Sequence, residues 1–113
     1  MANSFINKKV DLTTTYLTTL YTVPSARTAV IKSLLVSDDS GSGTTITITL
    51  VDSSSTIFKL FKDKSIGSKE TTELLTQPLI MEESEVLKVQ AGDANELHVV
   101  ASILEIQPRE VTT

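Results

Sequence analysis

The chain has 113 residues, a formal net charge of −4 and no cysteine. This length is typical of a single domain, and the lack of cysteine excludes disulfide bonds and thiolate chemistry. The negative charge argues against general binding to nucleic acid, which requires a basic patch facing the phosphate backbone.

The first nine residues are predicted to form a docking arm. Residues 1–9 are polar apart from Phe5 and Ile6, and chain ends are loose unless something holds them. Such an arm becomes ordered when its few apolar side chains bind a partner. We expect its deletion to weaken partner binding without unfolding the remaining domain, residues 10–107. The segment lacks the apolar stretch of a signal peptide, so we expect none.

Residues 10–23 are predicted to form two short strands. The segment is rich in Thr, Tyr and Leu, a composition that favours strands over a helix. Tyr16 and Leu20 also have the i,i+4 spacing of a helix, but the threonines and the following Pro24 oppose one. We place the break between the two strands near Thr14.

The clearest strand is predicted over residues 44–52, which alternate between Ile or Leu and Thr or Val. The isoleucines and Leu50 share one side, so this face is expected to be buried and the threonine face to be wet. Another strand is predicted over residues 28–37, whose apolar residues do not alternate, so that both of its faces are expected to be covered. The loop over residues 38–43 favours a hairpin between these two strands.

The rest of the chain continues in short strands and turns. Further strands are predicted over residues 56–62, 70–75, 78–81, 86–90 and 96–106. About eight short strands at regular spacing, with no helix required, predict an all-β fold, a single antiparallel β-sandwich or barrel over residues 10–107. Residues 108–113 are predicted to be a polar tail. There is no Trp, so the core is expected to be aliphatic, with these larger side chains: Phe58, Phe61, Tyr16 and Tyr21.

No catalytic set or cofactor site is predicted. His98 is the only histidine, and its place within the last strand favours a structural role over that of a base or a metal ligand. Four aspartates near turns could supply oxygens for Ca²⁺, although their spacing matches no EF-hand loop. They are Asp38, Asp39, Asp52 and Asp93. We therefore predict no enzyme activity, no cofactor and no metal ion.

Two charged segments are predicted to lie on the surface. The glutamates of residues 82–85 form an acidic edge, for which solvation is the simpler interpretation and a basic partner is the alternative. The lysines of residues 59–64 are interleaved with Asp63 and favour a solvated strand face.

No apolar run approaches the ~20 residues that a membrane helix needs. Neither nucleic acid nor a membrane is therefore an expected partner.

Several phrases of the sequence have a familiar order. They are YTVPSARTAVIKS at residues 21–33, TITITLVD at 45–52, PLIME at 78–82, EVLKVQA at 85–91 and VVASILEI at 99–106. In combination they resemble the small virion structural proteins of tailed bacteriophages, a group frequent in marine and cyanobacterial phages. The resemblance covers residues 3–107. It departs at residues 83–85, where a glycine-containing turn would be expected.

This resemblance implies a jelly-roll-like β-sandwich and a place on the virion. It implies a capsid decoration, or cement, protein that is made in the host cytoplasm, forms a homotrimer on the capsid surface and bridges neighbouring major capsid proteins. The residues expected to contact the partner are Phe5, Ile6, Val30, Leu34 and Val36. A neck, tail or fibre component is the first alternative, and a carbohydrate-binding module that contacts the host surface is the second.

Overall fold

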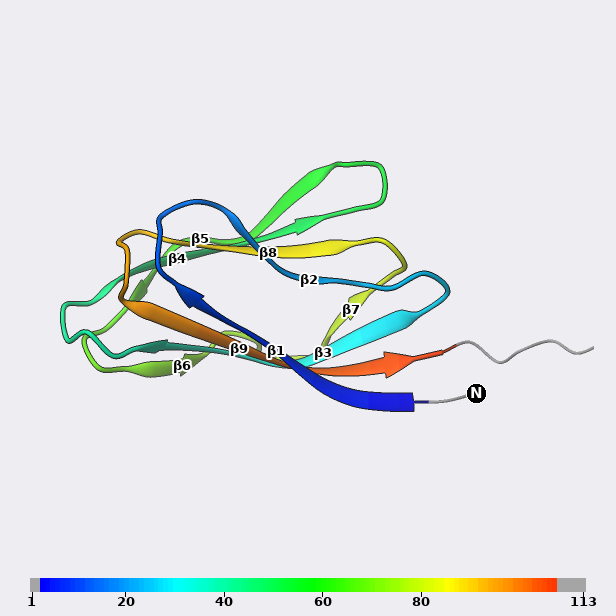
Figure 1. Ribbon diagram of the computed structural model, residues 1–113, viewed down its shortest axis with the longest axis horizontal. Helices are drawn as coiled ribbons and strands as arrows, with labels where there is room; N and C mark the ends of the chain where they lie inside the picture. Colours follow the sequence, from blue (N-terminus) through cyan, green and yellow to red (C-terminus); the bar gives the residue numbers. More distant parts are fainter. Residues whose placement is uncertain (1–2, 108–113) are drawn as a thin grey trace, which may run out of the picture.

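The computed structural model describes residues 3–107, which form nine β-strands (Figure 1). Their bounds are β1 Asn3–Leu12, β2 Thr18–Thr22, β3 Thr28–Asp38, β4 Thr44–Val51, β5 Ile57–Ile66, β6 Thr71–Glu73, β7 Leu79–Met81, β8 Val86–Ala91 and β9 Leu97–Ile106. The strand pairings are antiparallel. Within this described range, no helix is long and apolar enough to cross a membrane.

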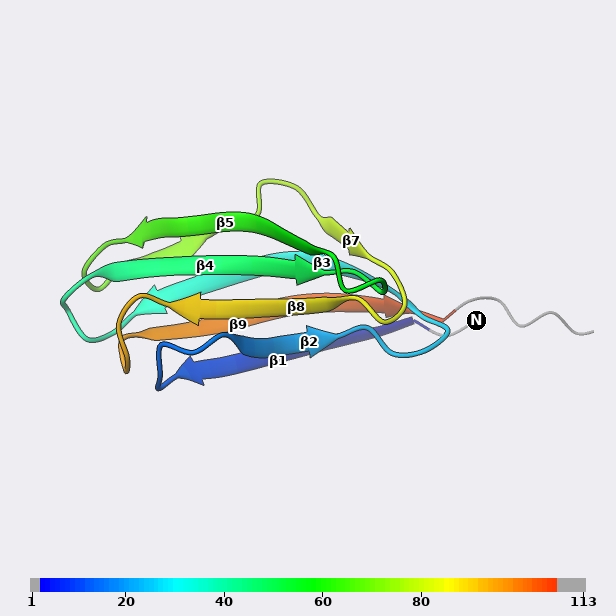
Figure 2. The same cartoon turned by 90° about the horizontal axis from the view of Figure 1, so that it is seen from above.

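The strands form two sheets that pack face to face. The first, which we call sheet A, has the order β1-β9-β3-β6, with β7 also paired to β3, and the second, sheet B, has the order β2-β8-β4-β5. Short strands β6 and β7 pair with opposite ends of β3, so together they fill one edge position. Seen from above, the four strands of sheet B lie side by side (Figure 2).

The chain crosses repeatedly between the two sheets. Strands β1, β3 and β9 belong to sheet A, whereas β2, β4 and β8 belong to sheet B, and β4 and β5 form a hairpin within sheet B. Because β6 and β7 share one position, each sheet has four strand positions, and this interleaved strand order is that of a jelly roll. The predicted fold class, a single antiparallel β-sandwich of jelly-roll type with about eight strands, is confirmed.

The connection from β3 to β4 differs from the hairpin that the sequence predicted. It forms a corner that carries the chain from sheet A to sheet B. The Asp38 carboxylate organises the corner by accepting hydrogen bonds from the amide and hydroxyl of Ser40, both at 2.9 Å. It also accepts the amides of Gly41 and Gly43 at 3.3 and 2.7 Å. Gly43 has a φ of 70°, and a Cβ there would lie 3.3 Å from the Ile66 carbonyl oxygen, so the corner requires glycine.

The core lies between the two sheets and follows the predicted period of two. The buried side chains of β9 are Leu97, Val99, Ala101 and Ile103. Those of β8 are Leu87, Val89 and Ala91. Ile46 and Ile48 of β4 are fully buried, as the alternation of that strand predicted. Removing this apolar surface from water is the main favourable term in folding.

The threonine face of β4 is less wet than the sequence predicted. Thr47 and Thr49 are both buried. The Thr47 hydroxyl accepts the Asp63 amide at 3.0 Å, at an irregular part of β5. Thr49 lies directly between Lys59 of β5 and Lys88 of β8, and long lysine stems shield a short threonine from water.

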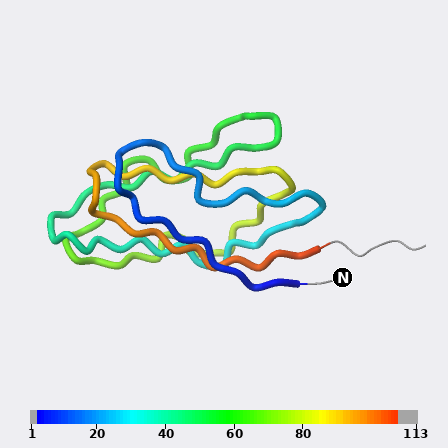
Figure 3. Tube along the Cα trace, viewed as in Figure 1, coloured from blue at the N-terminus to red at the C-terminus, as the bar shows by residue number. Residues whose placement is uncertain are grey.

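Only part of the predicted aromatic core is confirmed. Tyr21 is buried, and Phe61 packs against the core. Tyr16, in the turn between β1 and β2, is 76% exposed, and Phe58 of β5 is 48% exposed. Phe58 is exposed because it lies near the end of the β4–β5 hairpin, whose turn stands away from the rest of the sandwich in Figures 1 and 3.

The first residues form a strand of the sandwich and not the predicted arm. Residues 3–9 lie within β1, which pairs with β9 along its whole length, from Asn3 opposite Ile106 to Leu12 opposite Leu97. A polar stretch can join a sheet edge because pairing uses the backbone, and the side chains need only one packed face. Residues 1–2 of the predicted arm and the predicted tail, 108–113, lie outside the described residues.

Candidate interaction surface

The outer face of sheet A carries an apolar row that crosses four strands. Phe5 of β1 lies opposite Leu104 of β9, Leu104 lies opposite Val30 of β3, and Val30 lies opposite Ile80 of β7. Residues that are directly opposite in antiparallel strands point to the same face, so these four side chains, which we call the apolar row, form one patch. Phe5 is 77% and Ile80 56% exposed, while Val30 and Leu104 are half-buried.

The same face becomes mixed and then polar toward the other end of the sheet. The strand pairings place Lys9, Val100, Leu35 and Glu73 in one row. The next row toward the loops contains Asp11, His98, Ser37 and Thr71. The face therefore offers an apolar end for burial and a charged end that can orient a partner, because charges add specificity more than affinity.

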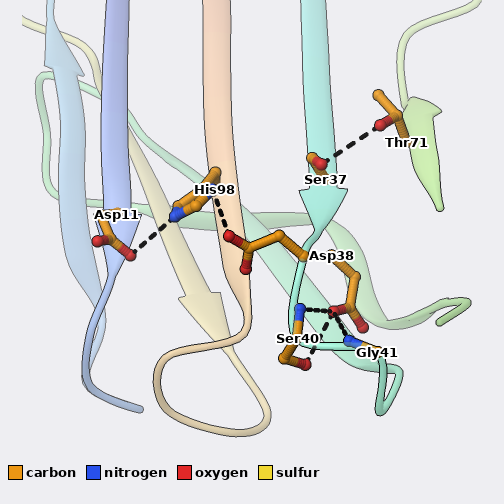
Figure 4. A network of polar contacts seen from close by, with 8 residues as sticks. Asp11, Ser37, Asp38, Ser40, Gly41, Thr71 and His98 are labelled. Carbon is orange, nitrogen blue, oxygen red and sulfur yellow. Dashed lines mark hydrogen bonds and ion pairs between the residues drawn. The ribbon is translucent and has the colours of Figure 1, made fainter. Parts of the chain in front are cut away.

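His98 lies in the polar row between two carboxylates (Figure 4). Its Nε2 is 3.3 Å from Asp11 Oδ1, and its Nδ1 is 3.7 Å from Asp39 Oδ2. In the same row, the Thr71 hydroxyl donates to Ser37 Oγ at 3.3 Å. The histidine side chain is partly exposed, and these contacts join β1, β9 and the corner after β3.

The structure brings together some of the predicted contact residues and separates the others. Phe5 and Val30 both belong to the apolar row. Ile6 points the opposite way and packs against the core. Leu34 and Val36 are fully buried between the sheets, so their prediction as outward contacts was wrong. A register irregularity in β3 between Ile31 and Ser33 changes which later residues face outward.

Sequence reasoning missed Leu104 and Ile80 as members of this surface. Leu104 lies within the last predicted strand, residues 96–106, but its neighbours across the sheet could not be identified without the strand order. Ile80 belongs to a strand of three residues, too short to show an alternating pattern. The signal that could have found them is pairing between β1, β9 and β3, which is a long-range property of the chain.

Sequence reasoning also missed a buried polar network at the same end of the sandwich. Glu105 of β9 points inward and is almost fully buried. The Tyr21 hydroxyl donates to its Oε2 at 2.5 Å, and Arg27 Nη1 donates to its Oε1 at 2.8 Å. Burial, then the hydrogen bond to Glu105 and its negative charge, raise the pKa of Tyr21 well above its ordinary value, although Arg27 opposes this. A carboxylate at an inward position of β9 was the sequence signal.

The four aspartates considered for Ca²⁺ serve separate turns. Asp38 organises the β3–β4 corner, and Asp52 accepts the amides of Ser54 and Thr56, both at 2.9 Å. Asp93 accepts the hydroxyl of Thr44 at 2.6 Å. Among the described residues, no group of three or more acidic or histidine side chains could hold a metal ion. Burial opposes ionisation of Asp38, but its hydrogen bonds from the corner outweigh this and lower its pKa.

The predicted acidic edge borders a shallow hollow. A space of about 410 Å³ is lined by Ala26, Arg27, Thr28, Ser53, Glu82, Glu83 and Glu85. Glu83 accepts the Ala26 amide at 2.5 Å and Glu85 accepts the Glu82 amide at 2.8 Å. Two of the three glutamates thus cap turns.

Comparisons with known proteins give distant structural likenesses. No family model matches the chain, and no curated protein matches it. A pentameric capsid protein from metagenomic phage sequences is similar over 88% of this chain and 60% of its own, with 16% identity and a TM-score of 0.42. The infectious bursal disease virus Gt strain structure is similar over 93% and 30%, with 10% identity and a TM-score of 0.48.

A third solved structure belongs to another class of protein. The C-terminal family 22 carbohydrate-binding module of Clostridium thermocellum Xyn10B is similar over 86% of this chain and 66% of its own, with 18% identity and a TM-score of 0.31. All three scores lie below 0.5, so these likenesses carry no argument about function. The fold assignment rests on the strand order itself.

Proposed function

We propose that this chain is a structural protein of a viral particle. More specifically, we propose a capsid decoration protein of a tailed bacteriophage that binds the outer shell and bridges neighbouring major capsid proteins. The observation that carries the proposal is the apolar row on the outer face of sheet A. The resemblance of residues 3–107 to small virion proteins supports the same assignment.

The apolar row has the properties of a surface that is buried in an assembly. Phe5 and Ile80 are exposed, large and apolar, and they lie in one row with two further apolar side chains. Contiguous apolar patches of this kind mark interaction sites, whereas single exposed apolar residues are normal. Burying such side chains contributes about 25 cal/mol per Å² of apolar area.

Shell stabilisation follows from mass action. A protein that binds the assembled shell but not its dissociated subunits stabilises the shell by an amount that grows with its free concentration relative to its Kd. We propose that three copies associate around the shell subunits that they bridge, as the resemblance implies. The polar row around His98 would then set the orientation of each copy through its charges.

Binding to depleted shells tests the proposal. Shells of the encoding virus that lack this chain would be incubated with purified protein and sedimented. Wild-type protein and the control variant Tyr16→Asp, which changes an exposed aromatic in a turn away from the apolar row, should sediment with the shells. Phe5→Asp and Ile80→Asp should remain in solution, because each places a charge in the apolar row. Equal binding by all four proteins would contradict the proposal.

A neck, tail or fibre position would use the same kind of surface at lower copy number. The number of copies per particle separates this alternative from decoration of the shell.

A carbohydrate-binding module is a second candidate because Tyr16 presents an exposed aromatic face. Sugar rings stack on such faces. Nearby residues, including Thr15 and Gln90, line a hollow of about 270 Å³. A glycan array probed with wild-type protein and Tyr16→Ala tests it, since a sugar site requires hits that the variant loses.

A further inference from the structure

We propose that two copies of this chain pair edge to edge through β5, so that sheet B of one copy continues into sheet B of the other. The occupant of this edge is a second copy of the chain in antiparallel orientation. The inference uses a different surface from the apolar row of sheet A. Its success or failure is therefore independent of the virion assignment.

Strand β5 begins with an exposed apolar edge. It is the outer strand of sheet B and has ten residues, whereas β2 has five and β6 and β7 have three each. At the start of β5, Ile57 is 62% and Phe58 48% exposed, while its lysines, Asp63 and the register irregularities with β4 lie from residue 59 onward. Natural proteins blunt edge strands with charges and bulges, and the first two residues of β5 carry neither.

The hydrogen bonds of the hairpin show which backbone groups of β5 are free for pairing. The Asp52 amide donates to the Thr56 carbonyl at 3.0 Å. Antiparallel ladders alternate between hydrogen-bonded and non-hydrogen-bonded pairs, and the register is regular through Phe58 opposite Leu50. The backbone groups of Phe58 therefore face β4, whereas those of Ile57 and Lys59 face the open edge.

This alternation restricts a symmetric pair to registers in which outward-facing residues of the two copies meet. Among these, the register that pairs Ile57 with Lys59 of the second copy places Phe58 opposite Phe58 on the two-fold axis, and it is the one that buries the exposed phenylalanines against each other. Phe58 then occupies a non-hydrogen-bonded pair, the position where side chains of antiparallel strands are closest. Two half-exposed phenylalanines would thus bury each other, which is the self-complementarity that a two-fold interface needs.

Charge complementarity supports a second copy as the occupant. Strand β5 carries Lys59, Lys62 and Lys64, and among the described residues none of these lysines lies within 4.0 Å of a carboxylate oxygen. In the proposed register, Lys62 and Lys64 of one copy lie toward the turn over residues 52–55 of the other copy. Ser53 of that turn lines the hollow that also contains Glu82, Glu83 and Glu85.

The dimer therefore contains two equivalent contacts between the lysines of one copy and the glutamates of the other. By symmetry, the basic half of each β5 approaches the acidic hollow of its partner, although the whole chain is net negative. Such exposed charge pairs add orientation and are screened by salt.

Cysteine scanning tests this register, because the chain has no cysteine of its own. The variants are Ile57→Cys, Phe58→Cys, Lys59→Cys and Leu60→Cys, with Thr13→Cys as an exposed control in the turn after β1. Under mild oxidation, Phe58→Cys should give the most disulfide-linked dimer on a non-reducing gel. Its two Cβ atoms would be about 4.5–5.5 Å apart, close to the spacing that a disulfide needs. No variant above the control, or a maximum at another position, would overturn the pairing.

Sedimentation of the protein without added cysteines gives an independent test. The Phe58→Asp variant should sediment with half the molecular mass of the wild-type protein, since it places two carboxylates opposite each other in the dimer. Ile80→Asp, which changes a side chain on the outer face of sheet A, should keep the β5 contact. A melting curve of Phe58→Asp confirms that the variant is folded. A monomeric wild-type protein, or an unchanged mass for folded Phe58→Asp, would refute the dimer.

Discussion

The buried network around Glu105 predicts a large stability loss for the small change Tyr21→Phe. The variant keeps the ring in the core and removes the hydroxyl, which donates to Glu105 Oε2 at 2.5 Å. Glu105 then retains its bond from Arg27 at 2.8 Å, but one oxygen of a nearly buried carboxylate loses its donor. The structure offers a matched control in Tyr16→Phe, where the tyrosine is exposed.

The expected magnitude follows from the charge on the acceptor. Hydrogen bonds to charged groups contribute about 1.5–3 kcal/mol, so Tyr21→Phe should lower the free energy of unfolding by about 2 kcal/mol. With an unfolding entropy of roughly 2.1 cal/mol/K per residue, this loss corresponds to a decrease in Tm of about 8 °C for a chain of this length. Tyr16→Phe should change the free energy by less than about 0.5 kcal/mol.

Urea denaturation at neutral pH measures both variants. A change in midpoint with an unchanged m-value reports stability alone. Equal midpoints for Tyr21→Phe and Tyr16→Phe would refute the reasoning, because the buried hydrogen bond would then contribute no more than an exposed hydroxyl.

Three further predictions concern pH and the core. The raised pKa of Tyr21 means that the folded state holds the phenolic proton more tightly than the unfolded state does. The resulting stabilisation is present below about pH 10 and is lost as the pH rises above it. Melting curves at alkaline pH should show this loss for the wild type and not for Tyr21→Phe. The lowered pKa of Asp38 gives the opposite pH dependence. Its stabilisation is present above about pH 4 and is lost as the pH falls through the lower pKa of the folded state. The Asp38→Asn variant should therefore have a lower Tm than the wild type at neutral pH and the same Tm in acid. Leu34→Ala should cost about 2–5 kcal/mol in urea denaturation because Leu34 is fully buried, whereas Val30→Ala should cost about 1 kcal/mol or less; similar losses for the two variants would contradict their placement on opposite faces of β3.

Local patterns were enough to predict most strands. The alternation of Ile and Thr in β4 and the threonine-rich composition of β2 both reflect the pleat of a strand. The break between β1 and β2 falls at residues 13–17, around the predicted Thr14. These features depend on neighbours in sequence, and so the sequence carries them.

The features that were missed depend on which strands become neighbours in space. Residues 3–9 show no apolar alternation, yet they pair with β9 through the backbone. A loop of five residues after Asp38 fits either a hairpin or a corner between sheets, and its hydrogen bonds select the corner. The candidate surface has the same origin, since Phe5 and Ile80 become neighbours of β9 and β3 only in the assembled sheet.

The corrected first strand changes one expectation about deletion. Removing residues 1–9 would delete most of β1 and expose the edge of β9, so the truncated protein should lose stability as well as binding. Phe5→Asp is therefore the better test of the surface, because it leaves the backbone pairing of β1 in place.

The virion assignment is tested most directly by counting copies of this chain in purified particles of the encoding virus. Quantitative mass spectrometry against the major capsid protein gives the ratio. A decoration protein that covers the shell predicts a ratio near stoichiometric. A ratio of a few copies per hundred capsid subunits would move the chain to the neck, tail or fibres, and its absence from particles would contradict the virion assignment.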